Sequence, residues 1–492
     1  MNINKYKWLL LLTGVLFVAC DSDDNTITAD DEPVIVTSGT ADFSKFVSVG
    51  NSLTSGYTDG ALFIASQENS LPNILAQQFA LAGGGEFTQP LMADNLGGIT
   101  LGGNVIIANR LFFNGSGPER LSGMPSTELT SPLSGSFNNM GVPGAKSFHL
   151  LAPGYGNIAG VQTGQANPYY VRFASSGSST VIGDAVAQQP TFFSLWIGNN
   201  DVLAYATSGG AGVNQAGNLD PSTYGGNDIT DPNVFASVYS GLADALTAGG
   251  AKGVVANIPN VTTIPYFTTI PFNPVPLDGA TAGAINQAYA QYNGGLLQAE
   301  GAQLITSEER AARTINFAAG QNAVVIVDEY LTNLSGLGLP SLRQTTAEDL
   351  IVLPAASFIG TTVNNNPQLI NGVTVPLGDQ WVLVPQEQQD VITATTTFNA
   401  TIKAIAQQKG LAFVDANALL DEVANTGVTF DEFTLNASLV FGGAFSLDGV
   451  HPTARGYAYL ANQFIIAINT TYGATLPAVN AVDYITLYPA SL

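Results

Sequence analysis

The sequence predicts a three-layer α/β domain, in which helices cover both faces of a parallel β-sheet. Three observations carry this prediction. Apolar runs of strand length alternate along the chain with segments of helical periodicity. Hydrophobic residues make up 46% of the 492 residues, enough for a large core in one big domain or two smaller ones. Helix candidates also begin at capping signals, as at Asp231-Pro232.

The first predicted elements follow a polar N-terminal stretch. The apolar run Phe43–Val49 is typical of a strand, and it ends at Gly50-Asn51-Ser52. We expect a helix over about 70–81, because Ser70 can cap it and the apolar residues behind it share one face. Residues 83–136 are rich in Gly, Asn and Ser. They indicate an insertion, with a hairpin as one option for its apolar stretch Val105–Phe113.

The middle of the chain continues the alternation of strands and helices. Thr191–Ile197 is predicted as a strand, and a Gly-, Asn- and Asp-rich loop covers 207–230. Asp231 then caps a helix that runs to about Ala248, and a short strand follows at Gly253–Ile258.

The last third supplies the remaining elements. Residues 335–385 match neither the helical nor the strand period, and we expect a second insertion there. The other predicted elements are a helix at Ala284–Ala299, buried strands at Val324–Val327 and Ala412–Val414, and helices at about 388–408 and 453–470.

Composition and charge exclude several classes of function. Acidic residues outnumber basic ones 37 to 14, which argues against a nucleic-acid partner, since such a partner requires clustered Lys and Arg. Neutral or apolar substrates fit this balance better than anionic ones. The chain has one cysteine, so no disulfide forms within it, and one Cys with two His residues does not make a zinc site. We therefore predict neither a metal nor a cofactor, and the sequence leaves the oligomeric state open.

The N-terminus reads as a processing signal. Lys5 and Lys7 precede the apolar run 8–19, which is too short to span a bilayer, and Cys20 follows it. An ordinary signal peptide with an incidental cysteine is one interpretation. The end of the run also resembles a bacterial lipobox, and this resemblance implies a signal peptide at 1–19 and an acylated Cys20.

The residues after Cys20 bear on where the protein is located. Residues 20–40 begin Cys-Asp-Ser-Asp-Asp and remain polar, as expected of an acidic flexible tether. Acidic residues directly after the cysteine resemble the surface-export signal of Bacteroidetes lipoproteins. The resemblance implies an outer-membrane lipoprotein exposed at the cell surface, with the periplasmic face as the alternative.

Histidine is the side chain that most often acts as a general base near neutral pH. The chain has two histidines, His149 and His451. Asp448 stands three residues before His451, close enough for its carboxylate to fix one ring nitrogen and leave the other free to accept a proton. A helix-capping Asp beside a surface His explains this pair equally well. His149 has no carboxylate near it in sequence, and a structural role suits it better.

Three further motifs follow predicted strands or open helices. Gly50-Asn51-Ser52-Leu53 places a serine at the carboxyl end of the first strand, where open α/β sheets bind ligands. Gly198-Asn199-Asn200-Asp201 follows another strand, and its side-chain amides can donate to a developing oxyanion. In 139–145, Asn-Met-Gly-Val-Pro-Gly-Ala, the N–H of Gly144 can do the same. Each motif alone also fits an ordinary turn.

Together, the four motifs resemble the sequence blocks of the SGNH (GDSL-type) hydrolases, in their expected order. The resemblance implies a parallel flavodoxin-like sheet in a three-layer sandwich. It also implies Ser52 as nucleophile, His451 as base and Asp448 as the residue that orients the base. The N–H groups of Ser52 and Gly144 and the amide of Asn200 would form the oxyanion hole.

The sequence departs from the family pattern in two ways. Asn51 stands where the family motif has Asp, a position outside the triad. The blocks are also widely spaced. We therefore expect a hydrolase domain at 41–475 with insertions at about 60–136 and 205–385, and a C-terminal extension at 476–492.

The expected activity is that of a lipase or esterase, which cleaves carboxylic esters through an acyl-serine intermediate. Apolar residues in the insertions favour substrates with acyl chains, although such residues are more often part of a core. Two alternatives stay open. One is a carbohydrate O-deacetylase that uses the same mechanism, and the other is a surface lipoprotein that binds a ligand without catalysis. Partners would be an ester substrate and the membrane that holds the lipidated Cys20.

Overall fold

The central feature of the computed structural model, which describes residues 35–492, is a parallel five-stranded sheet. Its strands lie in the order β6-β1-β7-β8-β15, and every neighbouring pair is parallel. Their bounds are β1 Phe46–Gly50, β6 Asn139–Gly141, β7 Phe192–Trp196, β8 Lys252–Ala256 and β15 Ala412–Val414. Numbered along the chain, this order is 2-1-3-4-5, the arrangement of flavodoxin-like folds. The predicted fold class is confirmed.

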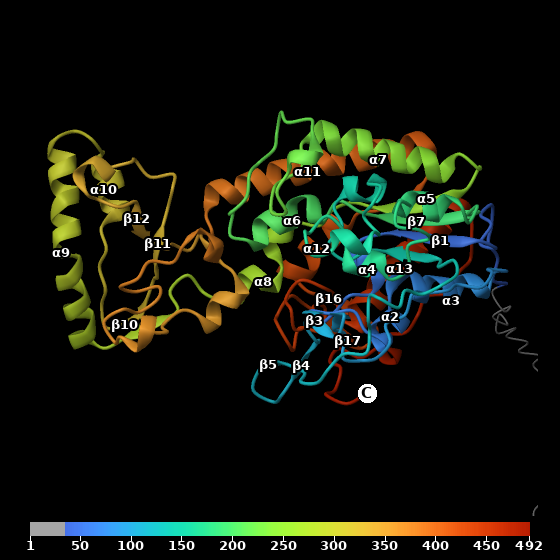
Figure 1. Cartoon of the computed structure of the whole chain (residues 1–492), viewed down its shortest axis with the longest axis horizontal. Coiled ribbons are helices and arrows are strands. Elements are labelled where there is room, and N and C mark those ends of the chain that lie inside the picture. The colour runs from blue at the N-terminus through green and yellow to red at the C-terminus, as the bar shows by residue number, and fades with distance from the viewer. Residues whose placement is uncertain (1–34) are drawn as a thin grey trace, which may run out of the picture. The chain divides into compact units, whose positions relative to one another are not determined.

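Helices cover both faces of this sheet (Figure 1). On one side, α13 (Ala454–Tyr472) packs against β8, β15 and α3 (Leu71–Ala80). On the other, α11 (Pro385–Lys409) packs against β8, β15 and α7 (Pro232–Thr247), while α5 (Val181–Val186) packs against β1 and α7. The result is a three-layer sandwich. Predictions about residues 1–34, which include the signal peptide and the lipidation of Cys20, lie outside the described residues.

Side-chain caps explain where three of these helices begin, and two of them, Ser70 and Asp231, were predicted from the sequence. Ser70 accepts a hydrogen bond from the N–H of Asn73, and Asp231 accepts from the N–H groups of two residues in the first turn of α7. Thr453 caps α13 by accepting from the N–H of Gly456. Each cap satisfies a backbone donor that has no partner within its helix.

A cluster of phenylalanines fills the core between the sheet and α3. Phe43 stacks on Phe79 with ring centroids 4.1 Å apart, and Phe46 and Phe192 meet Phe79 edge to face. All four side chains are buried. Burying a side chain of this size contributes roughly 1.5–3 kcal/mol, so the cluster anchors the start of the sheet.

The strand predicted at Val324–Val327 forms, but it does not belong to the central sheet. It forms β11 (Val325–Val327), but β11 pairs antiparallel with β12 (Leu342–Gln344), outside the central sheet. Arg343 on β12 holds this unit together through ion pairs of 2.5 Å with Asp328 and 2.6 Å with Asp349. The apolar run indicates a strand correctly, but it carries no information on which strand it will pair with.

The first insertion contains two hairpins where at most one was predicted. They are β2 (Ile99–Leu101) with β3 (Asn104–Ile107), and β4 (Leu111–Phe113) with β5 (Pro118–Arg120). The C-terminal residues pack against this region, since the ring of Tyr488 lies edge to face with Phe63, at 5.0 Å, and Arg110 donates to the carbonyl of Pro489.

The remaining elements are short, apart from one long helix in the second insertion. They are α1 Ser52–Ser55, α2 Ile64–Glu68, α4 Pro168–Val171, α6 Asn200–Thr207, α8 Pro265–Thr268, β9 Val275–Leu277, α9 Gly279–Gly301, α10 Ser307–Arg313, β10 Gly320–Asn322, β13 Leu350–Ile351, β14 Val382–Leu383, α12 Ala416–Asn425, β16 Val428–Phe430 and β17 Phe433–Leu435. Across residues 35–492, no helix is both long enough and apolar enough to cross a bilayer.

Candidate active site

Ser52 lies at the turn between β1 and α1, at the carboxyl edge of the sheet. It is the first residue of α1, and Asn51 caps the helix by accepting from the N–H of Leu53 at 3.0 Å. The turn needs glycine at position 50, because a Cβ there would lie 2.2 Å from Oγ1 of Thr54 and 2.3 Å from the carbonyl of Trp196. The close approach of three segments therefore fixes where Ser52 sits.

His451 and Asp448 form a hydrogen-bonded pair, with 2.9 Å between Nδ1 and Oδ2. The carboxylate of Asp448 also accepts from the N–H groups of Val450 and His451 and from the hydroxyl of Ser446. Burial raises the pKa of Asp448, but the charge of His451 and these hydrogen bonds outweigh burial and lower the pKa to about 2. Because Asp448 is ionised, it fixes the proton of His451 on Nδ1 and leaves Nε2 able to accept one.

Residues 57–60, which lead into the first insertion, contribute two contacts to this pair that the sequence motifs do not contain. The N–H of Gly60 donates to Oδ2 of Asp448 at 2.9 Å. The ring of Tyr57 lies against the imidazole of His451, with centroids 4.6 Å apart, and its hydroxyl donates to the carbonyl of Gly60. Tyr457 donates in turn to the carbonyl of Tyr57. These contacts hold both members of the pair in place, and no pattern in the sequence indicated them.

A second buried carboxyl group lies behind Asp448. Asp59 donates its N–H to the hydroxyl of Ser446, which itself donates to Asp448. One carboxyl oxygen of Asp59 accepts from the N–H of Leu447, while the other has no partner among residues 35–492. Burial, aided by the charge of Asp448, raises the pKa of Asp59 to about 7.

The predicted oxyanion donors occupy different surroundings. Asn200 is buried at the start of α6 and donates one amide hydrogen to the carbonyl of Ala145 at 2.9 Å. Gly144 lies on an exposed turn after β6, with φ at +79°. Within residues 35–492, the N–H groups of Ser52 and Gly144 have no acceptor. Gly141, by contrast, serves packing, because a Cβ there would lie 2.4 Å from the nitrogen of Ser55.

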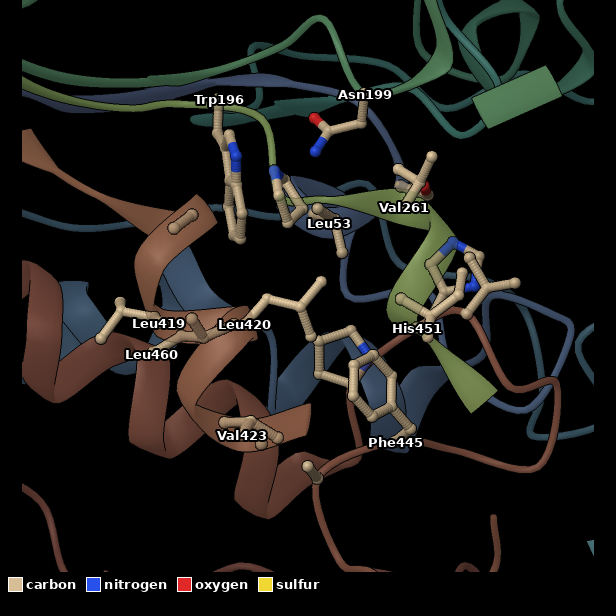
Figure 2. Close-up of a pocket in the computed structure, with 18 of the residues that line it drawn as sticks. Leu53, Trp196, Asn199, Val261, Leu419, Leu420, Val423, Phe445, His451 and Leu460 are labelled. Atoms are coloured by element: carbon tan, nitrogen blue, oxygen red, sulfur yellow. The ribbon is translucent and has the colours of Figure 1, made fainter. Parts of the chain in front are cut away.

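Ser52, Asn200 and His451 line one cavity, and Gly144 is not among the residues that line it. The cavity extends over the carboxyl ends of β1, β7, β8 and β15 towards α12 and α13 (Figure 2). Most of its wall is apolar, formed by Leu53, Trp196, Leu203, Pro259, Val261, Ile264, Ala416, Leu419, Leu420, Val423, Leu435, Ala444, Phe445, Val450, Pro452 and Leu460. No hydrogen bond joins Ser52 to His451 in the described chain, as is common in sites without substrate.

His149 is placed in a structural role. Its Nδ1 accepts from the N–H of Lys146 at 3.0 Å, and its ring stacks on Tyr155 at 4.7 Å. Burial, with the charge of Lys146, lowers the pKa of His149 to about 4. Among residues 35–492, no group of three His, Cys, Asp or Glu side chains is arranged to hold a metal ion.

Comparison with known proteins gives little further information. No family model matches the sequence, and no curated protein matches it either. Among solved structures, a catalytic mutant of Axe2, an acetylxylan esterase from Geobacillus stearothermophilus, is 11% identical with a TM-score of 0.31, covering 87% of this chain and 95% of that one. Another Axe2 mutant, described as an acetyl-xylooligosaccharide esterase, has the same identity and TM-score and covers 87% and 96%. A likeness of this size says nothing about the substrate of this chain.

Proposed function

We propose that this protein is a serine ester hydrolase in which Ser52, His451 and Asp448 form the catalytic triad. The observation that carries the proposal is the Asp448–His451 pair, held by five hydrogen bonds to Asp448 and lining the same cavity as Ser52. A buried, ionised carboxylate on Nδ1 and a free Nε2 are what a general base requires.

The proposed mechanism gives each of these residues one role. Nε2 of His451 takes the proton of Ser52 Oγ as that oxygen attacks the ester carbonyl. The N–H groups of Ser52 and Gly144 and the amide of Asn200 stabilise the oxyanion. The imidazolium, stabilised by Asp448, returns its proton to the departing alcohol. Water, activated in the same way, then hydrolyses the acyl-serine and releases the acid.

The apolar cavity supports an acyl group longer than acetyl. Each methylene moved from water into an apolar wall contributes about 0.8 kcal/mol, or roughly a fourfold gain in kcat/KM. We expect kcat/KM to rise with chain length until the cavity is filled. A deacetylase would leave the space over β8 and β15 empty, so we favour a lipase or esterase over a carbohydrate O-deacetylase.

The test compares the purified protein with its Ser52→Ala variant on p-nitrophenyl esters from acetate to palmitate and on acetylated xylan. Turnover that peaks at medium or long chains and is absent from the variant is the expected result. Activity confined to acetyl groups would favour the deacetylase. If no ester is cleaved and a fluorophosphonate fails to label Ser52, the protein is a binding lipoprotein and the proposal fails.

We also propose that the protein is anchored to the outer membrane through an acylated Cys20. This proposal rests on the sequence of the first 24 residues, where a basic start and an apolar run precede Cys20 and an acidic segment follows. Incorporation of labelled palmitate into the wild type but not into a Cys20→Ser variant would support it. Equal labelling of both proteins would refute it.

A further inference from the structure

Asn199 carries an unpaired hydrogen-bond donor in the wall of the cavity. Asn199 is 4% exposed and is one of the residues that line the cavity with Ser52. Within residues 35–492, Nδ2 of Asn199 has no hydrogen-bond partner. Buried polar groups without a partner destabilise a protein, and they are common where a ligand supplies the missing partner.

The orientation of this amide follows from its neighbours. The N–H of Leu53 donates to Oδ1 of Asn51 at 3.0 Å, so Nδ2 of Asn51 points the other way, towards Asn199. Nδ2 of Asn51 donates to Oδ1 of Asn199, also at 3.0 Å. The reverse orientation of Asn199 would bring two donors together. Nδ2 of Asn199 therefore points away from Asn51, and Figure 2 shows this nitrogen on the side of the labelled apolar side chains that line the cavity.

We propose that Nδ2 of Asn199 donates to an oxygen on the acyl chain of the substrate. The preferred substrates are then esters whose acyl group is apolar except for one ether, keto or hydroxyl oxygen near its carboxyl end. The inference rests on the proposed function, which places the acyl group in this cavity. The oxygen lies near the carboxyl end because Asn199 is bonded to Asn51, the residue next to Ser52.

The residue at position 51 determines whether Asn199 presents a hydrogen-bond donor or an acceptor to the cavity. An aspartate at position 51 would keep one oxygen for the N–H of Leu53 and turn the other towards Asn199. Asn199 would then rotate its amide to donate to that carboxylate, and its own oxygen would face the cavity. Asn51 stands where the resembled motif has Asp, and this one difference makes the cavity wall a donor.

The experiment compares p-nitrophenyl decanoate with analogues in which an ether oxygen replaces one methylene close to the carbonyl. The ratio of kcat/KM for the ether and alkyl esters is measured for the wild type, Asn199→Leu and Asn51→Asp. Comparing this ratio between proteins cancels the intrinsic reactivity of the two esters. If Asn199→Leu fails to fold, Asn199→Ala takes its place. A second measurement uses calorimetry to determine the Kd values of decanoate and its ether analogues for the Ser52→Ala protein.

We expect the ratio in the wild type to exceed that in Asn199→Leu about tenfold, the effect of one buried hydrogen bond. In Asn51→Asp the ratio should fall below that of Asn199→Leu, because two acceptors then face each other. Equal ratios in the wild type and Asn199→Leu would overturn the inference. An equal loss on both esters would also overturn it, because the amide would then serve the oxyanion. If no protein cleaves esters, the proposed function fails, and the calorimetric preference for the ether analogue alone decides this inference.

Discussion

Replacing Asp59 by Asn should stabilise the protein at neutral and alkaline pH and have little effect near pH 4. The pKa of Asp59 rises from 3.8 to about 7 on folding, chiefly because the side chain is buried and secondly because Asp448 lies nearby. Arg110 and the N–H of Leu447 oppose this rise without cancelling it. The folded protein therefore binds this proton more tightly than the unfolded chain does.

The sign and size of the effect follow from this difference. Because the pKa of Asp59 is raised in the folded state, its stabilising contribution to the free energy of unfolding is fully present below about pH 4. This contribution is lost as the pH rises through about 7. The difference of roughly three pH units corresponds to about 4 kcal/mol at about 1.4 kcal/mol per unit, as an order of magnitude. Asparagine keeps the oxygen that accepts from Leu447 and cannot ionise, so it avoids this loss.

The assay is urea unfolding of the wild type and Asp59→Asn at pH values from about 4 to about 8. The difference in unfolding free energy should grow by a few kcal/mol in favour of the variant and level off above about pH 7. Asp42→Asn is a matched control. Hydrogen bonds from Ser44 lower the pKa of this exposed residue from 3.8, so its stabilising contribution is already present above about pH 4, and the difference between this variant and the wild type should stay nearly constant from about pH 5 to about pH 8. A difference for Asp59→Asn that does not change with pH would refute the reasoning.

Three further predictions concern catalysis and are checked by steady-state kinetics on an active ester. Asp448→Asn should lower kcat by about 10³–10⁴-fold, because the neutral amide neither fixes the tautomer of His451 nor stabilises its cation; a loss below tenfold would contradict this role. Asn200→Ala should lower kcat by about 10²–10³-fold with little change in KM, and His149→Ala, its control, should remain active. Tyr57→Leu should lower kcat about tenfold by releasing the ring of His451, while Tyr57→Phe keeps the ring contact and most of the activity; equal losses in both would contradict the packing role.

The parts of the fold that the sequence predicts are those set by local rules. Ser70, Asp231 and Thr453 each cap the helix that follows them, and a cap depends only on residues within one turn. The pairing of β11 with β12 was not predicted, because a short apolar run reads the same in a parallel core sheet and in a small antiparallel unit.

The candidate active site also combines features set by local sequence with features set by contacts between distant segments. Ser52, Asp448 and His451 lie in short motifs, and the resemblance of these motifs to the family blocks predicts the roles that we propose for them. Gly60 and the orientation of Asn199 depend on contacts between segments far apart in the chain, such as the bond from Gly60 to Asp448 across 388 residues. Nothing in either segment alone indicates that contact.

The bond between Gly60 and Asp448 also has a consequence for biosynthesis. Ser52 and its turn are made early, whereas Asp448 is made 388 residues after Gly60, and His451 follows it. Contacts of such sequence separation form slowly, because a long loop must close before they do. Under the proposed function, the growing chain therefore carries its nucleophile without a base, and any product truncated before Asp448 stays in that state.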